Sequence, residues 1–452
     1  MYKVTNPATG TVIEEFPTAT DVQIAEAIEQ AHRGYLSWKE TPVETRAKIV
    51  QRVAEVFKER TDELAAIITQ EMGKRIEESK GELGTVFEIF SYYAQNGQTL
   101  MADEPLEIQG GNAVIQKRPV GVILGIMPWN YPYYQVARFV APNLMLGNTI
   151  LLKHASNCPK SAAAIVSVLR EAGVPEDAYI NIYASNQQIA SALADKRIQG
   201  VSLTGSERAG SAVAAEAGRN LKKVVLELGG SDPMVILDSD DLDKTVNIAV
   251  ASRMGNMGQA CNAPKRMIVM ADIYDEFVEK LTEKMAAFAP GDPSDPSTTL
   301  APLSSVSAAD EVVRQIEEAV EQGATLRTGG YRIDRPGAYV QPAVLTDVTS
   351  EMAAYHEEVF GPAAIVFRAS SEEEAVELAN DTEFGLGSGV FSADPERARR
   401  VGDQIEAGMV YINQAGGSQA DLPFGGIKRS GVGRELGPLG MDEFMNKKVV
   451  RL

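Results

Sequence analysis

Two residues of this chain carry side chains that could act together in nucleophilic catalysis. Cys261 follows the small and polar run Gly258-Gln259-Ala260, and a cysteine nucleophile works as its thiolate. Glu227 stands at the end of an apolar run, just before two glycines that permit close approach of a ligand or another segment. Burial there would raise the pKa of the carboxyl group toward the range of a general base. The two residues predict a cysteine nucleophile served by a glutamate base.

Both residues also have a structural interpretation. Most lone cysteines are inert core residues, and a buried glutamate can simply bond to the backbone. A papain-like hydrolase would need a histidine partner, and the three candidates His32, His154 and His356 stand in uninformative settings. Glutamate is therefore the more plausible base, while the residues alone leave the structural interpretation open.

Two further segments could stabilise negative charge on a ligand. Asn130, in the run PWNYP, follows a glycine-flanked strand and could donate its amide to a developing oxyanion, an effect worth about 100- to 1000-fold in rate. Residues 202–210 follow a predicted strand and open a helix, where backbone N–H groups and the helix dipole can hold a phosphate. The glycines Gly205 and Gly210 do not form a GxGxxG fingerprint. A plain turn remains an alternative for each segment.

The elements that must position these residues alternate between short apolar runs and helical stretches. We expect buried strands at 122–126, 149–152, 179–183, 201–203 and 224–228, with helices such as 159–172 between them. A second series has strands at 266–270, 363–367, 387–391 and 408–412 among helices near 273, 307, 371 and 395. This alternation predicts α/β units built on mostly parallel sheets.

Size and composition bound the function. A chain of 452 residues with 44% hydrophobic content should divide into two or three folding units. A net charge of -19 argues against nucleic acid or an anionic membrane as a partner. The chain starts without a signal-like segment and has only two cysteines, so we expect a cytoplasmic protein. Its three scattered histidines predict no metal site.

The order of short motifs resembles the aldehyde dehydrogenase superfamily over essentially the whole chain. The motifs are, in order, PWNYP, LLKHAS, LTGS, LELGG, GQAC, EEVFGP and PFGG. The combination of LELGG with GQAC about thirty residues later is specific to the family. The runs LLKHASN and LGGSDP and the length are similar to those of its shorter members, the NAD(P)-dependent succinate-semialdehyde dehydrogenases.

The resemblance implies a division of the chain. Residues 1–107 and 128–229 would form a Rossmann-type cofactor-binding domain, and residues 230–429 an α/β catalytic domain. Residues 108–127 and 443–452 would form a small β oligomerisation segment that pairs strand edges across subunits. A homodimer or homotetramer would follow.

The resemblance also implies a reaction. Cys261 would attack the aldehyde carbon to give a thiohemiacetal, and Asn130 with the Cys261 backbone N–H would form the oxyanion hole. Hydride transfer to nicotinamide would leave a thioester, and Glu227 would deprotonate the water that hydrolyses it. Relatives that transfer the acyl group to coenzyme A typically lack this base, so we expect release of the free acid.

The cofactor residues implied by the resemblance are Met127, Trp129, Lys153, Ser156, Gly205, Ser206, Leu228, Glu358 and Phe360. Lys153 and Ser156 would meet the adenosine ribose, Gly205 and Ser206 the pyrophosphate, and Glu358 with Phe360 the nicotinamide ribose and ring. Ser156 stands where many NAD-preferring relatives have a glutamate. Its presence removes repulsion against a 2′-phosphate, and Lys153 could attract one. We expect NADP to be accepted as well as NAD, with the preference left open.

The resemblance further suggests Arg138 as an anchor for the substrate carboxylate, with Ser418 as a second anchor. Some relatives carry another arginine six residues before the cysteine, where this chain has Gly255, with Arg253 two positions earlier. Which residues bind the substrate carboxylate therefore stays open. The alternatives are a dehydrogenase of another short aldehyde, such as glutarate semialdehyde or an aliphatic one, and a catalytically silent cofactor-binding protein on the same fold.

Overall fold

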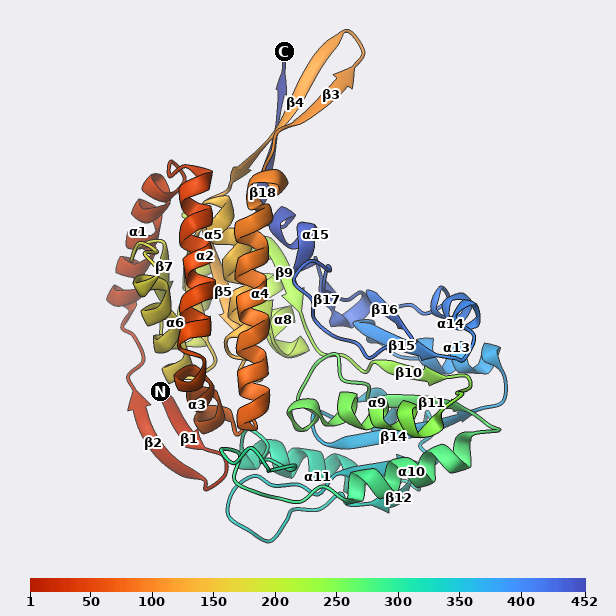
Figure 1. Cartoon of the computed structure of the whole chain (residues 1–452). Helices are drawn as coiled ribbons and strands as arrows, with labels where there is room; N and C mark the ends of the chain where they lie inside the picture. Colours follow the sequence, from red (N-terminus) through yellow and green to blue (C-terminus); the bar gives the residue numbers. More distant parts are fainter.

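The structure is a computed structural model that describes residues 1–452. Figure 1 shows two α/β units side by side and a narrow β projection that leaves the body near the C-terminus. A hairpin of β1 (Tyr2–Asn6) and β2 (Thr11–Phe16) runs along the outside of the first unit. The predicted α/β class is confirmed.

The first unit is built on a six-stranded sheet. Its strands, in spatial order, are β17 (Gly431–Val432), β9 (Lys223–Glu227), β8 (Ile198–Thr204), β5 (Val122–Met127), β6 (Thr149–His154) and β7 (Tyr179–Asn181). All neighbours pair in parallel except β17, which is antiparallel to β9. The carboxyl ends of β5, β8 and β9 therefore meet at one edge of the sheet, where ligands of such sheets usually bind.

Eight helices surround this sheet. They are α1 (Asp21–Trp38), α2 (Val43–Glu59), α3 (Thr61–Met72), α4 (Ile76–Leu100), α5 (Tyr134–Leu146), α6 (Pro159–Glu171), α7 (Asn186–Ala194) and α8 (Glu207–Arg219). Every residue of α5 is buried, which fits a helix packed between α2, α4 and the sheet. The predicted helix at 159–172 is confirmed, and it ends before Gly173, whose φ is 90°.

The second unit is built on a seven-stranded sheet. The order is β12 (Thr325–Thr328), β13 (Ala343–Thr346), β14 (Ala363–Ala369), β11 (Arg266–Met270), β10 (Pro233–Ile236), β15 (Gly387–Phe391) and β16 (Met409–Ile412). Only β12 pairs in antiparallel fashion. The accompanying helices are α9 (Leu242–Met254), α10 (Tyr274–Ala286), α11 (Val306–Glu321), α12 (Ala353–His356), α13 (Glu372–Asn380) and α14 (Pro395–Gly402). Each strand and helix expected in this series is present.

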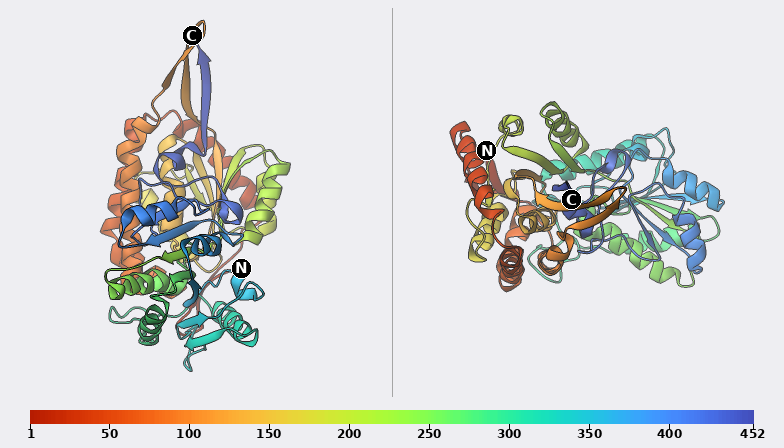
Figure 2. Two further views of the ribbon diagram at one scale, coloured as in Figure 1. Left: turned by 90° about the vertical axis from the view of Figure 1, so that its right-hand side faces the viewer. Right: turned by 90° about the horizontal axis from the view of Figure 1, so that it is seen from above.

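The β projection is a three-stranded antiparallel sheet in the order β18 (Met445–Arg451), β4 (Gly111–Pro119) and β3 (Glu104–Ile108). Its last strand, β18, follows α15 (Gly437–Asp442) in the chain, and the projection stands clear of the body in the left-hand view of Figure 2. Its strands do not follow the predicted bounds of 108–127. The projection begins at residue 104, and residues 122–127 pair instead with β6 and β8, because their apolar run is buried inside the six-stranded sheet.

None of the helices is long and apolar enough to cross a membrane.

Candidate active site

Cys261 lies in the loop between α9 and β11, directly after a tight turn. Asn256, Met257 and Gly258 all have positive φ, between 50° and 75°. Such a conformation costs of order 1–3 kcal/mol at each non-glycine residue, so the surroundings must hold it. The Asn256 amide does so by donating to the carbonyl of Asn130 at 2.9 Å and to that of Gln259 at 3.2 Å. The nucleophile loop (residues 256–261) is thereby fixed against the PWNYP segment.

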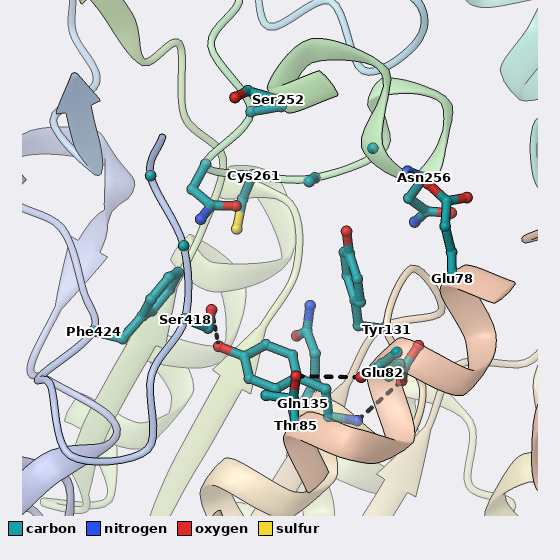
Figure 3. A pocket seen from close by; sticks show the side chains of 18 of the residues that line it. Glu78, Glu82, Thr85, Tyr131, Gln135, Ser252, Asn256, Cys261, Ser418 and Phe424 are labelled. Carbon is teal, nitrogen blue, oxygen red and sulfur yellow. Dashed lines mark hydrogen bonds between the residues drawn. The ribbon is translucent and has the colours of Figure 1, made fainter. Parts of the chain in front are cut away.

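Cys261 stands between two cavities. One, here called the substrate-side cavity, is lined by residues that include Tyr131, Arg138 and Ser418 and has a volume of about 370 Å³. The other, here called the cofactor-side cavity, is lined by residues that include Trp129, Glu358 and Phe360 and has a volume of about 280 Å³. A third, mostly apolar cavity of about 210 Å³ lies between α7 and α8. In Figure 3, Cys261 projects into the first cavity, with Ser418 and Phe424 on one side and Tyr131 on the other.

The thiol of Cys261 is held in its neutral form. Burial raises its pKa to about 12, while the positive charges of Arg138 and Lys265 act in the opposite direction. The nucleophile is therefore protected at rest, and two cations are in place to favour the thiolate.

Glu227 ends β9, and its carboxyl group is buried beside Gly425 of the PFGG segment. Neither carboxyl oxygen has a hydrogen-bond partner within the protein. Burial holds the pKa well above its usual range, and the nearby charge of Arg138 lowers it. Although Glu227 does not line either cavity, its charge raises the pKa of Cys261. The arrangement offers a carboxyl group of raised pKa whose two oxygens have no partner in the protein, and the side chain must turn toward Cys261 to act on a water molecule there.

Asn130 lines the cofactor-side cavity, and its amide is already oriented. Its Nδ2 donates to the Gln259 carbonyl at 3.0 Å, and its Oδ1 accepts from Gln135 at 3.0 Å. The donor end therefore faces the nucleophile loop. To hold an oxyanion, it must exchange the Gln259 carbonyl for the substrate oxygen.

Glu82 of α4 and Lys74, in the loop between α3 and α4, fix the start of α5, which carries Arg138. The carboxylate of Glu82 accepts the backbone N–H groups of Tyr133 at 2.8 Å and Tyr134 at 3.0 Å. Lys74 pairs with the same carboxylate, and both side chains are fully buried. A carboxylate at a helix N-terminus is favoured by the helix dipole, so α5 starts at a defined point next to PWNYP.

Arg138 lines the substrate-side cavity, but its guanidinium is engaged inside the protein. It forms an ion pair with Glu435 and donates to Thr204 at 3.0 Å and to the Tyr134 hydroxyl at 3.3 Å. The Tyr134 hydroxyl in turn donates to Ser418 Oγ at 2.7 Å. The two predicted anchors are thus joined through Tyr134. Glu435 and Thr204 were missed from the sequence, because no local motif relates positions so far apart, and Tyr134 was missed although it lies one helical turn before Arg138.

Arg253 does not reach the substrate-side cavity. It is fully buried and donates only to backbone carbonyls, including those of Gly258, Val359 and Ala363. It therefore does not supply the second carboxylate-binding arginine that some relatives place near this position.

The predicted cofactor residues are mostly brought together. Trp129, Asn130, Gly205, Ser206, Leu228, Glu358 and Phe360 line the cofactor-side cavity with Cys261. Lys153 lines the apolar cavity between α7 and α8. Met127 lies buried at the end of β5, Ser156 is exposed in the loop after β6, and neither lines one of these three cavities.

The residues that line these cavities suit the parts of a nicotinamide dinucleotide. The apolar slot between α7 and α8 suits an adenine ring, with the Lys153 amine at its border. Ser206 caps the N-terminus of α8, where backbone N–H groups and the helix dipole favour a diphosphate. Trp129 and Phe360 meet edge to face at 5.9 Å and give the cavity beside Cys261 an aromatic wall.

The chain resembles known proteins over its full length. Residues 1–450 match the aldehyde dehydrogenase family. The chain is 52% identical to the NADP⁺ succinate-semialdehyde dehydrogenase of Deinococcus radiodurans, over 100% of this chain and 94% of that protein. It is 46% identical to succinate-semialdehyde dehydrogenase [NADP⁺] 1 of Mycobacterium tuberculosis, over 98% of each chain.

A solved structure agrees with these relatives. The crystal structure of succinic semialdehyde dehydrogenase from Streptococcus pyogenes in complex with NADP⁺ superposes with a TM-score of 0.98 at 43% identity, covering 100% of both chains.

Proposed function

This chain belongs to the aldehyde dehydrogenase family, and we propose that it oxidises succinate semialdehyde to succinate with NADP. The observation that carries the proposal is the position of Cys261, which lines both a cofactor-shaped cavity and a cavity that contains Arg138 and Ser418. The NADP⁺ succinate-semialdehyde dehydrogenases to which the chain is 46–52% identical support the choice of substrate and cofactor.

The chemistry begins at Cys261. The thiol first loses its proton to solvent, which the charges of Arg138 and Lys265 favour. The thiolate then adds to the aldehyde carbon, and the resulting oxyanion accepts hydrogen bonds from Asn130 Nδ2 and the Cys261 backbone N–H. Bound nicotinamide would supply the oxidant by accepting the hydride of the thiohemiacetal. The cysteine then carries the acyl group as a thioester. Glu227 takes a proton from water, which attacks the thioester and releases the acid and the thiol.

Arg138 supplies the positive charge for the substrate carboxylate. It is the only lysine or arginine that lines the substrate-side cavity, and Glu78 and Glu82 line the same cavity. Glu82 is neutralised by Lys74. The carboxylate would bind at the Tyr134–Ser418 end of the network, where the guanidinium donates to the Tyr134 hydroxyl. In this way the Arg138 guanidinium, although all its contacts are within the protein, polarises the hydroxyl groups of Tyr134 and Ser418 that would contact the substrate carboxylate.

The choice of NADP follows from the loop after β6. Ser156 is exposed there and brings no carboxylate, while Lys153 borders the adenosine cavity. A 2′-phosphate would gain the attraction of the lysine without repulsion from an acidic side chain.

We also propose that the protein forms a homodimer or homotetramer through its β projection. The edge strands of the projection are unpaired within one chain, and Val449 of β18 is 65% exposed. A second chain would satisfy these edges. Sedimentation equilibrium tests the assembly, and a monomer at micromolar concentration would overturn it.

We further propose a cytoplasmic location, because both cysteines are free thiols.

The function is tested by following NADPH absorbance with succinate semialdehyde, and by identifying the product by mass spectrometry. We expect succinate in equal amount to NADPH, and complete loss of turnover on treatment with iodoacetamide or in Cys261→Ala. Turnover that persists in Cys261→Ala would contradict the mechanism. A parent protein that binds NADP without turning over any aldehyde would support a catalytically silent protein.

A further inference from the structure

Lys265 is a buried cation that contacts two functional segments at once. Its Nζ donates to the backbone carbonyls of Ala260 at 2.8 Å and Cys261 at 2.7 Å. The same amine pairs with the carboxylate of Glu358 at 3.0 Å, and the Lys265 side chain is only 2% exposed. One ammonium group therefore joins the nucleophile loop to the segment that carries Glu358 and Phe360.

A second buried cation joins the same two segments from another side. Arg253 donates to Gly258 O at 3.3 Å in the nucleophile loop, and to the carbonyls of Val359 and Gly361 in the other segment. The segments also touch directly. A Cβ atom on Gly258 would lie 2.2 Å from Gly361 O, so no side chain fits between them. The two segments are thus in direct contact, with no space for a side chain at this point.

The joined segments face a common cavity. Cys261, Glu358 and Phe360 all line the cofactor-side cavity, and Glu358 also accepts the backbone N–H of Gly230 at 3.1 Å. Without Lys265, the Glu358 carboxylate would keep only this one bond, the Cys261 carbonyl would lose its donor, and the Ala260 carbonyl would keep only the backbone N–H of Ala263 at 3.2 Å.

We propose that Lys265 is a positioning residue that holds Glu358 and the Cys261 backbone in register, and so sets the cofactor-binding carboxylate relative to the nucleophile. This inference rests on the proposed function, in which Glu358 binds the nicotinamide ribose. The arrangement predicts that cofactor affinity and nucleophile reactivity both depend on one lysine that touches neither the substrate nor the thiol.

The test is a mutant cycle of Lys265→Met, Glu358→Gln and the double variant, with NADP binding measured by quenching of tryptophan fluorescence. Trp129 lines the cavity and reports on it. We expect Kd for NADP to rise about tenfold in each single variant and by no more in the double variant, because both changes break one unit. Independent effects that multiply in the double variant would overturn the proposal.

A second readout follows the nucleophile. The pH midpoint for alkylation of Cys261 by iodoacetamide should move upward in Lys265→Met, and the single-turnover rate of NADPH formation should fall about 100-fold. The KM for the aldehyde should change by less than about threefold. An unchanged midpoint and an unchanged single-turnover rate would contradict a positioning role. Lys265→Gln keeps a donor for the two carbonyls and serves if the methionine variant does not fold.

Arg266→Met is the matched control. Arg266 is an equally buried cation at the next position, but its guanidinium lies over the rings of Tyr355 and Phe367. Its loss should leave Kd for NADP and the alkylation midpoint unchanged, and similar shifts in this variant would count against the role of Lys265. If the parent binds NADP but does not oxidise succinate semialdehyde, the proposed function fails while the Lys265–Glu358 coupling can still be measured.

Discussion

The cofactor side and the substrate side of Cys261 are built in different ways. The cofactor-side cavity takes its residues from strand ends and from the N-terminus of α8, in contiguous runs such as Thr204–Ser206. On the substrate side, Arg138 depends on Glu435, about 300 positions away, and Tyr134 depends on Ser418. The proposed cofactor residues thus come mostly from contiguous runs, with Glu358 and its partner Lys265 as the exception, whereas the proposed substrate contacts are side-chain pairs that only the fold brings together.

Glu227 belongs to neither cavity, and its removal should have the largest effect. We expect Glu227→Gln to lower steady-state turnover by about 1000-fold, because the thioester loses its base. The first turnover should survive as a burst of NADPH in a rapid-mixing experiment. If the burst disappears to the same extent as steady-state turnover, Glu227 acts before thioester formation and its assignment is wrong.

Removal of the proposed carboxylate anchor on the substrate side should change kcat/KM differently for two aldehydes. In Arg138→Met, kcat/KM for succinate semialdehyde should fall about 100-fold, while that for butanal should change by less than about threefold. The single variant leaves Glu435 buried without its partner, which destabilises proteins by about 3–5 kcal/mol. The double variant Arg138→Met/Glu435→Gln should recover thermal stability but not the carboxylate preference. Equal losses for both aldehydes would remove Arg138 from substrate recognition.

A substitution at Ser156, on the cofactor side, should raise the KM for NADP but not that for NAD. Ser156→Glu places a carboxylate beside the proposed 2′-phosphate, and we expect KM for NADP to rise about 30-fold through charge repulsion. KM for NAD, measured on the same preparation, is the internal control and should stay the same or fall. A uniform rise for both cofactors would show a disturbed loop rather than a lost phosphate site.

The smallest expected effect concerns one buried carboxyl group in each unit. Burial raises the pKa of Glu71 in the first unit and of Asp232 in the second to about 7. The pKa of each is higher in the folded than in the unfolded chain. The stability they contribute is therefore present below about pH 4 and is lost as the pH rises through about 7.

The measurement is the melting temperature between pH 5 and pH 8. The parent should lose several degrees over this interval, and Asp232→Asn should lose less. If the asparagine variant shows the same slope as the parent, the Asp232 carboxyl group does not titrate in this range.

The contrast between the two sides also describes what the sequence can predict. Strands such as 122–126 and 363–367 were predicted correctly, because a buried parallel strand is a nearly continuous apolar run with turn residues at its ends. The cofactor residues could be proposed because the short contiguous motifs that carry them resemble those of a known family. The role of Lys265 was missed, since a lysine beside an apolar strand has no local sign of burial. The partnership of Glu435 with Arg138 was missed because only the folded chain brings the two together.

The central claim is that Cys261 works between an NADP cavity and a carboxylate-binding cavity. The most direct measurement is kcat/KM at saturating NADP for succinate semialdehyde and for butanal, which has a similar chain without the carboxylate. We predict that succinate semialdehyde is preferred by about 100-fold or more, roughly 3 kcal/mol at about 1.4 kcal/mol per decade. Equal values for the two aldehydes would contradict the claim and leave only a general aldehyde dehydrogenase.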